Sequence, residues 1–324
     1  MSPIAVSGDI AKAYMQIRLA EEDQKLFRFL WKGPKDEEIT CFEMGRVPWG
    51  AVPSGFLLAA TLRSHFKLID PGNTLQLSDC FYHDDMLRGF NTVEGASRFI
   101  DTLTSGLQAA GMQMSKWKTN SEGVRQHLRG LGYEVPAKSD LKILGIVWCT
   151  EQDTLSLTDP FLPELARSSE IFTKRKVLQI VASLFDPLGW CLPYTIRGKL
   201  LLKAVWEADV GWDHTVPKQL AEEIKTWCSE ATDIASLRIP RAYHCTSGEV
   251  VERQLHVFGD ASEKSYSAAA YVQTIFKRGP SATSLLMAKS RVAPKTSPSL
   301  PRLELLASLL AARLEAILLS PTTG

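Results

Sequence analysis

The 324-residue sequence lacks the marks of several classes of protein. No apolar run approaches the roughly 18–20 residues that a transmembrane helix requires, so no membrane partner is expected. The N-terminus has neither the basic segment nor the apolar core of a secretory signal peptide, and no internal repeat or low-complexity tract is present. We therefore expect a cytoplasmic or nuclear protein that is not secreted.

Paired cysteine motifs are also missing. The six cysteines lie far apart and no Cys-x-x-Cys occurs, which argues against a zinc ribbon and favours reduced, buried thiols. With 45% hydrophobic and 23% charged residues, the chain has enough apolar surface to build cores, so intrinsic disorder is not expected. Its length suits about two or three domains.

An excess of one charge sign is absent as well, since 37 Lys and Arg stand against 36 Asp and Glu. The charge is nevertheless segregated along the chain. Residues 161–205 carry seven basic and three acidic residues, whereas residues 206–240 carry three basic and seven acidic ones. A basic segment of this kind can follow a phosphate backbone even though the total charge is near zero.

The spacing of apolar residues predicts a mixture of short strands and helices in the first half. Residues 56–66 and 94–110 have helical spacing, and Gly111 would end the second helix. The apolar stripe of the first helix is expected to comprise Phe56, Leu57, Ala60 and Phe66. The strands are expected at 80–90, as a hairpin, and at 141–148 and 155–157, as a pair.

The pattern becomes helical from about Pro160 and changes to strands near the C-terminal end. The polar stretch 240–253 separates these two regions and is the best candidate for a domain boundary. Helices are expected at 174–185, 196–206 and 301–314, and strands at 254–259, 266–273 and around 285–289.

An acidic pair, Asp84-Asp85, lies at the tip of the expected hairpin. Two carboxylates about 4 Å apart repel each other by roughly 1–4 kcal/mol, and divalent cations relieve that repulsion. Two metal ions held by such carboxylates suit in-line phosphoryl transfer. Taken alone, the pair is more typical of a solvated acidic turn than of a metal site.

The order of motifs around this pair points to one family. DIAKAYMQI begins at Asp9, PWGAVPSGF follows at 48–56, and YHDD stands at 82–85. This series resembles the palm motifs of reverse transcriptases. The resemblance continues in GLQAAGMQMSKWKTNS at 106–121 and LKILGIVW at 141–148. It narrows to the Pol polyprotein of Bel-Pao LTR retrotransposons through RKVLQIVASLFDPLGW at 175–190, TIRGKLLLKAVW at 195–206 and PRLELLASLLAARL at 301–314.

The resemblance implies a role for each matching residue. Asp9, Asp84 and Asp85 would bind two Mg²⁺ or Mn²⁺ ions, and Lys116 would act as a general acid on the triphosphate. The residues that would line the nucleotide pocket are Tyr14, Trp49, Gly50 and Ser54. From spacing alone, the tyrosine is equally well a core aromatic, and a lysine by itself is more often a solvated surface residue.

Primer and template contacts are implied at two places. Tyr82 and His83 belong to the hairpin, where the histidine stands in place of the small or flexible apolar residue that is usual in the family. The second group of implied contacts is formed by Lys174, Arg175 and Lys176, at the start of the basic helices.

The C-terminal strands resemble an RNase H-like domain. HVFGDASEKSYSAAAYV at 256–272 places Asp260 at the end of a strand, where it would bind metal, and Glu304 would be the second carboxylate. The more ordinary interpretation of Glu304 is the polar face of an amphipathic helix. Because the resemblance places a further carboxylate after Gly324, RNase H activity is not expected of this chain.

We therefore expect an α+β protein with three parts. They are a reverse-transcriptase palm with its fingers largely missing (1–158), a mostly helical thumb and connection (159–250), and the N-terminal half of an RNase H-like α/β domain (251–324). The expected function is RNA-directed DNA synthesis from dNTPs on a primed RNA or DNA template, within a longer Pol polyprotein. The alternative is a degenerate, inactive remnant that at most binds nucleic acid.

Overall fold

The computed structural model describes residues 2–34, 38–70, 72, 77–138, 140–143, 145–157, 171–242, 249–295 and 298–319. The chain divides into two compact units. The first contains the described residues up to 138 together with 150–152, and the second contains the remainder.

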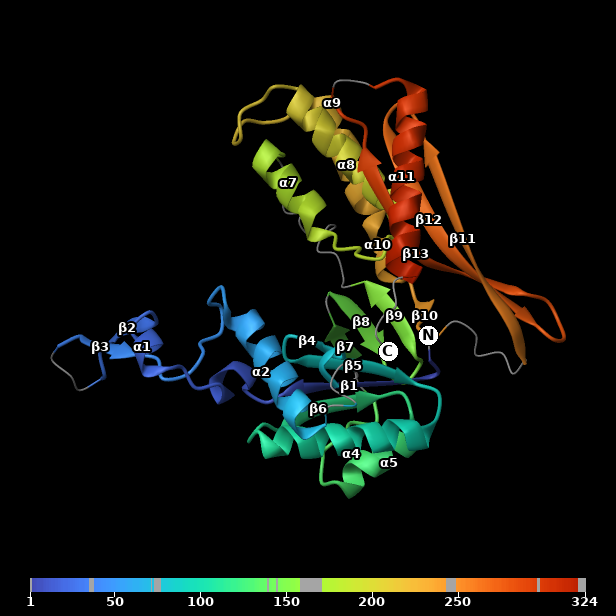
Figure 1. Cartoon of the computed structure of the whole chain (residues 1–324). Coiled ribbons are helices and arrows are strands. Elements are labelled where there is room, and N and C mark those ends of the chain that lie inside the picture. The colour runs from blue at the N-terminus through green and yellow to red at the C-terminus, as the bar shows by residue number, and fades with distance from the viewer. Residues whose placement is uncertain are drawn as a thin grey trace. The chain divides into compact units, whose positions relative to one another are not determined.

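The first unit is built around a four-stranded antiparallel sheet in the order β4-β5-β1-β6 (Figure 1). Its strands are β1 (Ile4–Ile10), β4 (Phe81–Tyr82), β5 (Asp85–Phe90) and β6 (Met114–Thr119). A separate hairpin is formed by β2 (Arg28–Trp31) and β3 (Thr40–Glu43). The helical elements are the 3-10 helix η1 (Ala13–Gln16) and the α-helices α1 (Glu21–Gln24), α2 (Ser54–Ile69), α4 (Val93–Ala109) and α5 (Glu122–Gly130).

One core lies between this sheet and helices α2, α4 and α5. Its fully buried side chains include Phe66 of α2, Ile100 of α4 and Leu128 of α5, which pack with Ile10 of β1 and Met86 of β5. Burial of one such side chain stabilises the fold by about 1.5–3 kcal/mol. The core therefore covers one face of the sheet.

The two predicted helices of this unit are confirmed, but the stripe of α2 is not. Helix α4 begins at the Thr92 cap, whose hydroxyl accepts from the Gly95 amide, and ends before Gly111, which has a φ of 72°. In α2 the buried apolar face consists of Leu58, Leu62 and Phe66. The prediction of Phe56 on that face was wrong, because its side chain is 74% exposed.

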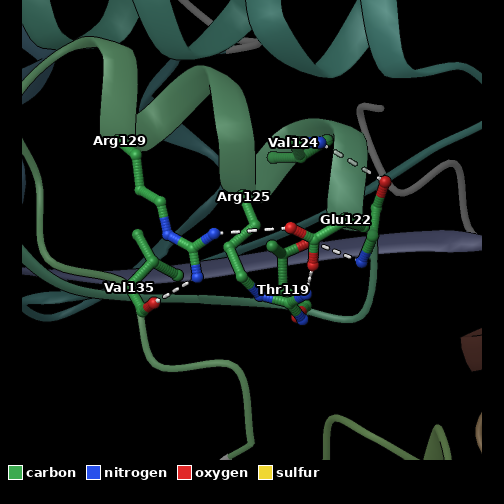
Figure 2. A network of polar contacts seen from close by, with 7 residues as sticks. Thr119, Glu122, Val124, Arg125, Arg129 and Val135 are labelled. Carbon is green, nitrogen blue, oxygen red and sulfur yellow. Dashed lines mark hydrogen bonds and ion pairs between the residues drawn. The ribbon is translucent and has the colours of Figure 1, made fainter.

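A buried arginine ties α5 to the end of β6. Arg125 donates to the Thr119 carbonyl at 3.0 Å and forms an ion pair with Glu122 (Figure 2). Arg129, one turn later, donates to the carbonyl of Val135 at 3.4 Å and also faces Glu122. Arg125 therefore bonds α5 to the end of β6, and Arg129 bonds it to the segment that follows the helix.

The second unit combines a small sheet, a group of helices and a larger sheet covered by one helix (Figure 1). The small sheet has the order β10-β9-β8-β7, from β7 (Asp140–Ile143), β8 (Ile146–Cys149), β9 (Thr154–Leu157) and β10 (Ile239–Pro240). The helices are α7 (Lys174–Ser183), α8 (Leu192–Glu207), α9 (Lys218–Ser229) and α10 (Ala231–Ala235). The antiparallel sheet β11 (Val250–Ala261), β12 (Ser265–Phe276) and β13 (Ala282–Val292) is packed against α11 (Leu300–Leu319).

Two details of the second unit differ from prediction or refine it. The stretch 141–148 was predicted as one strand and is instead a hairpin of β7 and β8, because Gly145 turns the chain with a φ of 83°. The three C-terminal strands and their helix are confirmed but are longer than predicted. The polar stretch 240–253 is described only in part, since residues 243–248 lie outside the described residues, as do residues 158–170.

Glycine makes one close approach possible inside this unit. Gly189 has a φ of 73°, and a Cβ added there would lie 2.0 Å from the carbonyl oxygen of Ala288 on β13. The neighbouring Leu188 carbonyl accepts from the Ala288 amide at 2.8 Å. The turn before α8 is therefore bonded directly to the backbone of β13.

Buried thiols were predicted for the cysteines, but the structure shows burial for only some of those it describes, since Cys41 is exposed. The five cysteines that the structure describes are free thiols, of which Cys191 and Cys228 are buried. None of the described helices is long and apolar enough to cross a membrane. The overall content is mixed α and β, as predicted.

Candidate active site

Strand register brings Asp9 and Asp85 together in the first unit. In the antiparallel pair of β1 and β5 these two residues lie directly opposite each other. Side chains alternate between the faces of a sheet, and the following residues, Ile10 and Met86, are both fully buried in the core. The two carboxylates therefore lie on the face away from the core.

The turn between β4 and β5 adds the third carboxylate. Asp84 lies in this turn, and its carbonyl accepts from the amide of Ile10 at 2.9 Å. Partial burial, followed by repulsion from Asp84 and Asp9, raises the pKa of the Asp85 carboxyl. Asp84 and Asp9 thus lie close enough to destabilise the charged form of Asp85.

A backbone irregularity brings a lysine to the same place. The register of β6 shifts between its pairings with Ser7 and Asp9, and Lys116 within this bulge has a φ of 52°. Its ammonium forms an ion pair with the Asp9 carboxylate and is 73% exposed. The hydrogen bond from Lys116 to Asp9 raises the pKa of the lysine, so the lysine stays charged in this pairing.

The donor set at this site has the right chemistry for a hard divalent cation. Carboxylate oxygens on adjacent strands are the ligands that Mg²⁺ and Mn²⁺ prefer, and their mutual repulsion would be relieved by an ion. Among the residues that the structure describes, no three acidic, histidine or cysteine side chains converge on one point as they stand. The Asp9 carboxylate forms an ion pair with the Lys116 ammonium instead.

Tyr14 lies beside the carboxylates, on η1. The ring packs partly against the core, and the hydroxyl lies 3.2 Å from Nδ1 of His83. Burial, together with the charges of Asp84 and Asp85, raises the pKa of the tyrosine. The structure therefore reconciles the two interpretations of this residue, since one end packs in the core and the other faces the acidic site.

The predicted nucleotide-pocket residues 49–54 do not all reach the surface. Ser54 is 3% exposed, and its hydroxyl donates to the Pro48 carbonyl at 2.6 Å. Its local role is to close the loop before α2. Trp49 is 73% exposed, and Gly50 has a φ of 84° with open space around its Cα. Only the latter two are free to meet a ligand directly.

The predicted primer and template residues are divided between the two units. Tyr82 is 58% exposed and contacts the ring of His83 edge-on in the first unit. In the second unit Lys174 lies 5.1 Å from the centre of the Trp206 ring. Arg175 makes a two-pronged ion pair with Asp213 at 2.9 and 3.1 Å, and the hydrogen bond from the arginine lowers the pKa of that carboxyl.

The predicted RNase H carboxylates are both exposed in the second unit. Asp260 lies at the end of β11, and Glu304 lies on the first turns of α11. Close packing joins these elements, because a Cβ added to Gly259 would lie 2.9 Å from the carbonyl oxygen of Ala307. The ordinary interpretation of Glu304, on the polar side of its helix, also agrees with its exposure.

Sequence reasoning missed three partners in these sites. The pairing of Lys116 with Asp9, the bond from Tyr14 to His83 and the pairing of Arg175 with Asp213 join residues far apart in sequence. The pairing of Lys116 with Asp9 follows from the antiparallel register of β1 and β6 together with the bulge in β6. Neither feature can be read from the sequence.

Comparison with protein families agrees with this geometry. Residues 1–146 match the family described as reverse transcriptase (RNA-dependent DNA polymerase), and residues 173–322 match the Pao retrotransposon-like RNaseH-like domain. The second match includes helices α7 to α10 as well as the three-stranded sheet, so the division predicted at residue 250 stays a prediction. A search of curated proteins found no significant match. The chain belongs to the reverse transcriptase and RNase H-like region of the Bel-Pao retrotransposon Pol polyprotein.

Proposed function

We propose that this region catalyses RNA-directed DNA synthesis, adding nucleotides to a primer 3′-hydroxyl on an RNA or DNA template. The observation that supports this best is the direct opposition of Asp9 and Asp85, with Asp84 bonded to the same strand. Three mutually repelling carboxylates on a rigid sheet form a site prepared for positive charge. The family match supports the reaction class, and the placement of the three carboxylates supports their assignment to it.

The roles of the acidic residues follow from this proposal. Asp9, Asp84 and Asp85 would hold two Mg²⁺ or Mn²⁺ ions, which when bound would activate the primer hydroxyl and neutralise charge on the triphosphate. Trp49 and Gly50 would contact the incoming nucleotide, and Tyr14 would support its sugar. The dNTP and the primed template are the proposed partners, in the context of a longer Pol polyprotein.

Lys116 has two competing roles in the proposal. In the absence of an ion its ammonium neutralises Asp9, and its raised pKa keeps the proton in place. When Asp9 takes a cation instead, the flexible and exposed lysine is free to donate to the triphosphate. The lysine therefore reduces the repulsion among the carboxylates when no metal is bound. When metal is bound, it supplies a proton or a positive charge to the triphosphate.

Replacing Lys116 with glutamine is expected to separate these roles. The Mg²⁺ concentration needed for half-maximal extension should fall, because Asp9 no longer pairs with an ammonium. The turnover number should fall by about 10²-fold or more, as for the loss of a general acid. Titration of extension rate against Mg²⁺ measures both, with Lys118→Gln on the same strand as the control. Unchanged values of both quantities would exclude a role for this lysine.

The proposed nucleic-acid contacts of the second unit lie at the start of α7. Lys174 and Lys176 carry charge there, whereas Arg175 is already paired with Asp213. We propose that the two lysines, and the arginine when it leaves its partner, meet backbone phosphates of the primed template. The cytoplasm or nucleus is the proposed location of this activity.

The inactive-remnant alternative is separated from the polymerase by one pair of assays. Purified chain is incubated with oligo(dT) primed on poly(rA), dTTP, and either Mg²⁺ or Mn²⁺, and extension is compared with template binding. The polymerase proposal expects extension by the wild-type chain. Binding with a steep salt dependence but no extension would support the remnant instead.

A further inference from the structure

The histidine in the hairpin turn has a left-handed backbone conformation. Strands β4 and β5 are joined by His83 and Asp84, and His83 has a φ of 58°. Histidine is among the few non-glycine residues that are enriched in this left-handed region. Because the Asp84 carbonyl is bonded to Ile10, the turn that carries the imidazole is itself held in place.

Three residues from different elements surround this imidazole. Nδ1 lies 3.2 Å from the hydroxyl of Tyr14 on η1, and the ring meets Tyr82 edge-on at 4.9 Å between centroids. On the remaining side lies Gly55 in the first turn of α2, where an added Cβ would stand 2.4 Å from Cε1 of the imidazole. The ring therefore occupies space that any other residue at position 55 would fill.

We propose that His83 is a positioning residue for Tyr14. Its imidazole fixes the tyrosine hydroxyl and thereby the ring that would support the sugar of an incoming nucleotide. The expected effect on sugar selectivity rests on the proposed polymerase function, whereas the contact between His83 and Tyr14 does not. An apolar side chain at this position would touch the ring without bonding the hydroxyl, so the bond is a property of this chain's Tyr-His-Asp-Asp turn.

The expected consequence is a change in sugar selectivity rather than in chemistry. Asp84 and Asp85 are held by the strand register and by the Ile10 amide, neither of which needs the imidazole. Loss of the bond should therefore act through the position of Tyr14, and so affect dNTPs and rNTPs differently. It should lower the preference for dNTPs over rNTPs, measured as the ratio of kcat/KM values, by about three- to tenfold.

A double-mutant cycle separates the bond from other effects of substitution. Tyr14→Phe and His83→Ala each remove one partner, and the cycle subtracts the strain and packing changes that each introduces alone. His83→Asn serves as the rescue variant, because its amide lies near the position of Nδ1 and asparagine tolerates the left-handed backbone. Gly55→Ala gives a second route, since it displaces the imidazole while keeping it in the chain.

The experiment measures selectivity and unfolding for the same set of variants. Full-length protein is assayed with dTTP and UTP on the poly(rA) template, and the urea midpoint is recorded without added metal. We expect both single substitutions and Gly55→Ala to lower selectivity to the same extent, with no further loss in the double variant and recovery in His83→Asn. The shifts in urea midpoint should be non-additive in the same way.

The outcomes distinguish failure of this inference from failure of the polymerase proposal. Wild-type extension combined with additive effects in the cycle would overturn the role of His83 alone. A wild-type chain that extends no primer would overturn the polymerase proposal, and the unfolding cycle would then decide whether His83 positions Tyr14. Additive midpoint shifts would show that it does not.

Discussion

Replacement of Asp85 with asparagine is expected to abolish primer extension and, at neutral pH, to stabilise the metal-free fold. Activity should fall by about 10²- to 10³-fold or more, because a charge that the proposed mechanism places against the ions is lost. Stability should rise because burial and the neighbouring Asp84 and Asp9 disfavour the charged carboxylate, as its raised pKa shows. One substitution is thus expected to move activity and stability in opposite directions.

The pH dependence of this gain has a definite sign. A carboxyl whose pKa is raised by folding destabilises the fold at pH values above the raised pKa, where it is charged in both states. As the pH falls through the raised pKa towards the ordinary value, the wild-type carboxyl protonates and the cost disappears. The advantage of Asp85→Asn should therefore be full at neutral pH and vanish in acid. Thermal midpoints in a chelator at several pH values measure it.

The matched control for Asp85 is an exposed carboxylate outside the site. Asp23→Asn, on α1 of the same unit, should change neither extension nor the pH dependence of the midpoint. Mg²⁺ should raise the midpoint of the wild type more than that of Asp85→Asn, because binding to the folded state alone adds stability. A destabilised Asp85→Asn protein at neutral pH would contradict the proposed repulsion.

The largest stability effect is expected at an ion pair in the second unit. Asp153 accepts from Nε and Nη2 of Arg241 at 2.6 and 2.8 Å, and also from the indole of Trp148 at 3.0 Å. The two charged side chains are only 18% and 10% exposed. Asp153→Ala should destabilise this unit by about 3–5 kcal/mol, because it leaves a buried guanidinium without its carboxylate.

The test for this pair compares it with an exposed one. Glu222→Ala removes the partner of Lys225 on α9, where both side chains are about half exposed, and should cost only about 0–1 kcal/mol. Urea unfolding followed by tryptophan fluorescence gives both free energies. The double substitution Asp153→Ala with Arg241→Met should recover much of the loss, since the buried guanidinium that has lost this carboxylate is then absent. Equal costs at the two sites would contradict the burial argument.

Local pattern was enough to predict much of the fold. The hairpin at 80–90, the helix at 94–110 and the C-terminal strands with their helix each follow from short-range spacing and end signals, and each is present. The errors arose where tertiary packing decides. The spacing of Phe56 predicted that it would be buried, but helix α2 buries Leu58, Leu62 and Phe66 and leaves Phe56 exposed. A glycine turn likewise divided the strand predicted at 141–148.

The residues of the candidate site were predictable, but their partners were not. Asp9, Asp84 and Asp85 stand in a motif order, whereas the contacts of Lys116 and His83 depend on a bulge and on a left-handed turn. The bulge is set by the long-range pairing of β1 with β6, and the partners of His83 lie on η1 and α2, so no local pattern encodes these contacts. The prediction for Ser54 failed in a different way. This residue was assigned to the nucleotide pocket, but its hydroxyl donates to the neighbouring Pro48 carbonyl.

The central claim is tested most directly by template-directed incorporation on a primed RNA of mixed sequence. With Mg²⁺ or Mn²⁺ present, each of the four dNTPs is supplied singly to wild-type protein and to Asp84→Asn protein. We expect the wild type to add only the nucleotide complementary to the first template base, and the variant to add none. Incorporation that ignores the template base, or wild-type incorporation no greater than that of Asp84→Asn, would contradict the central claim.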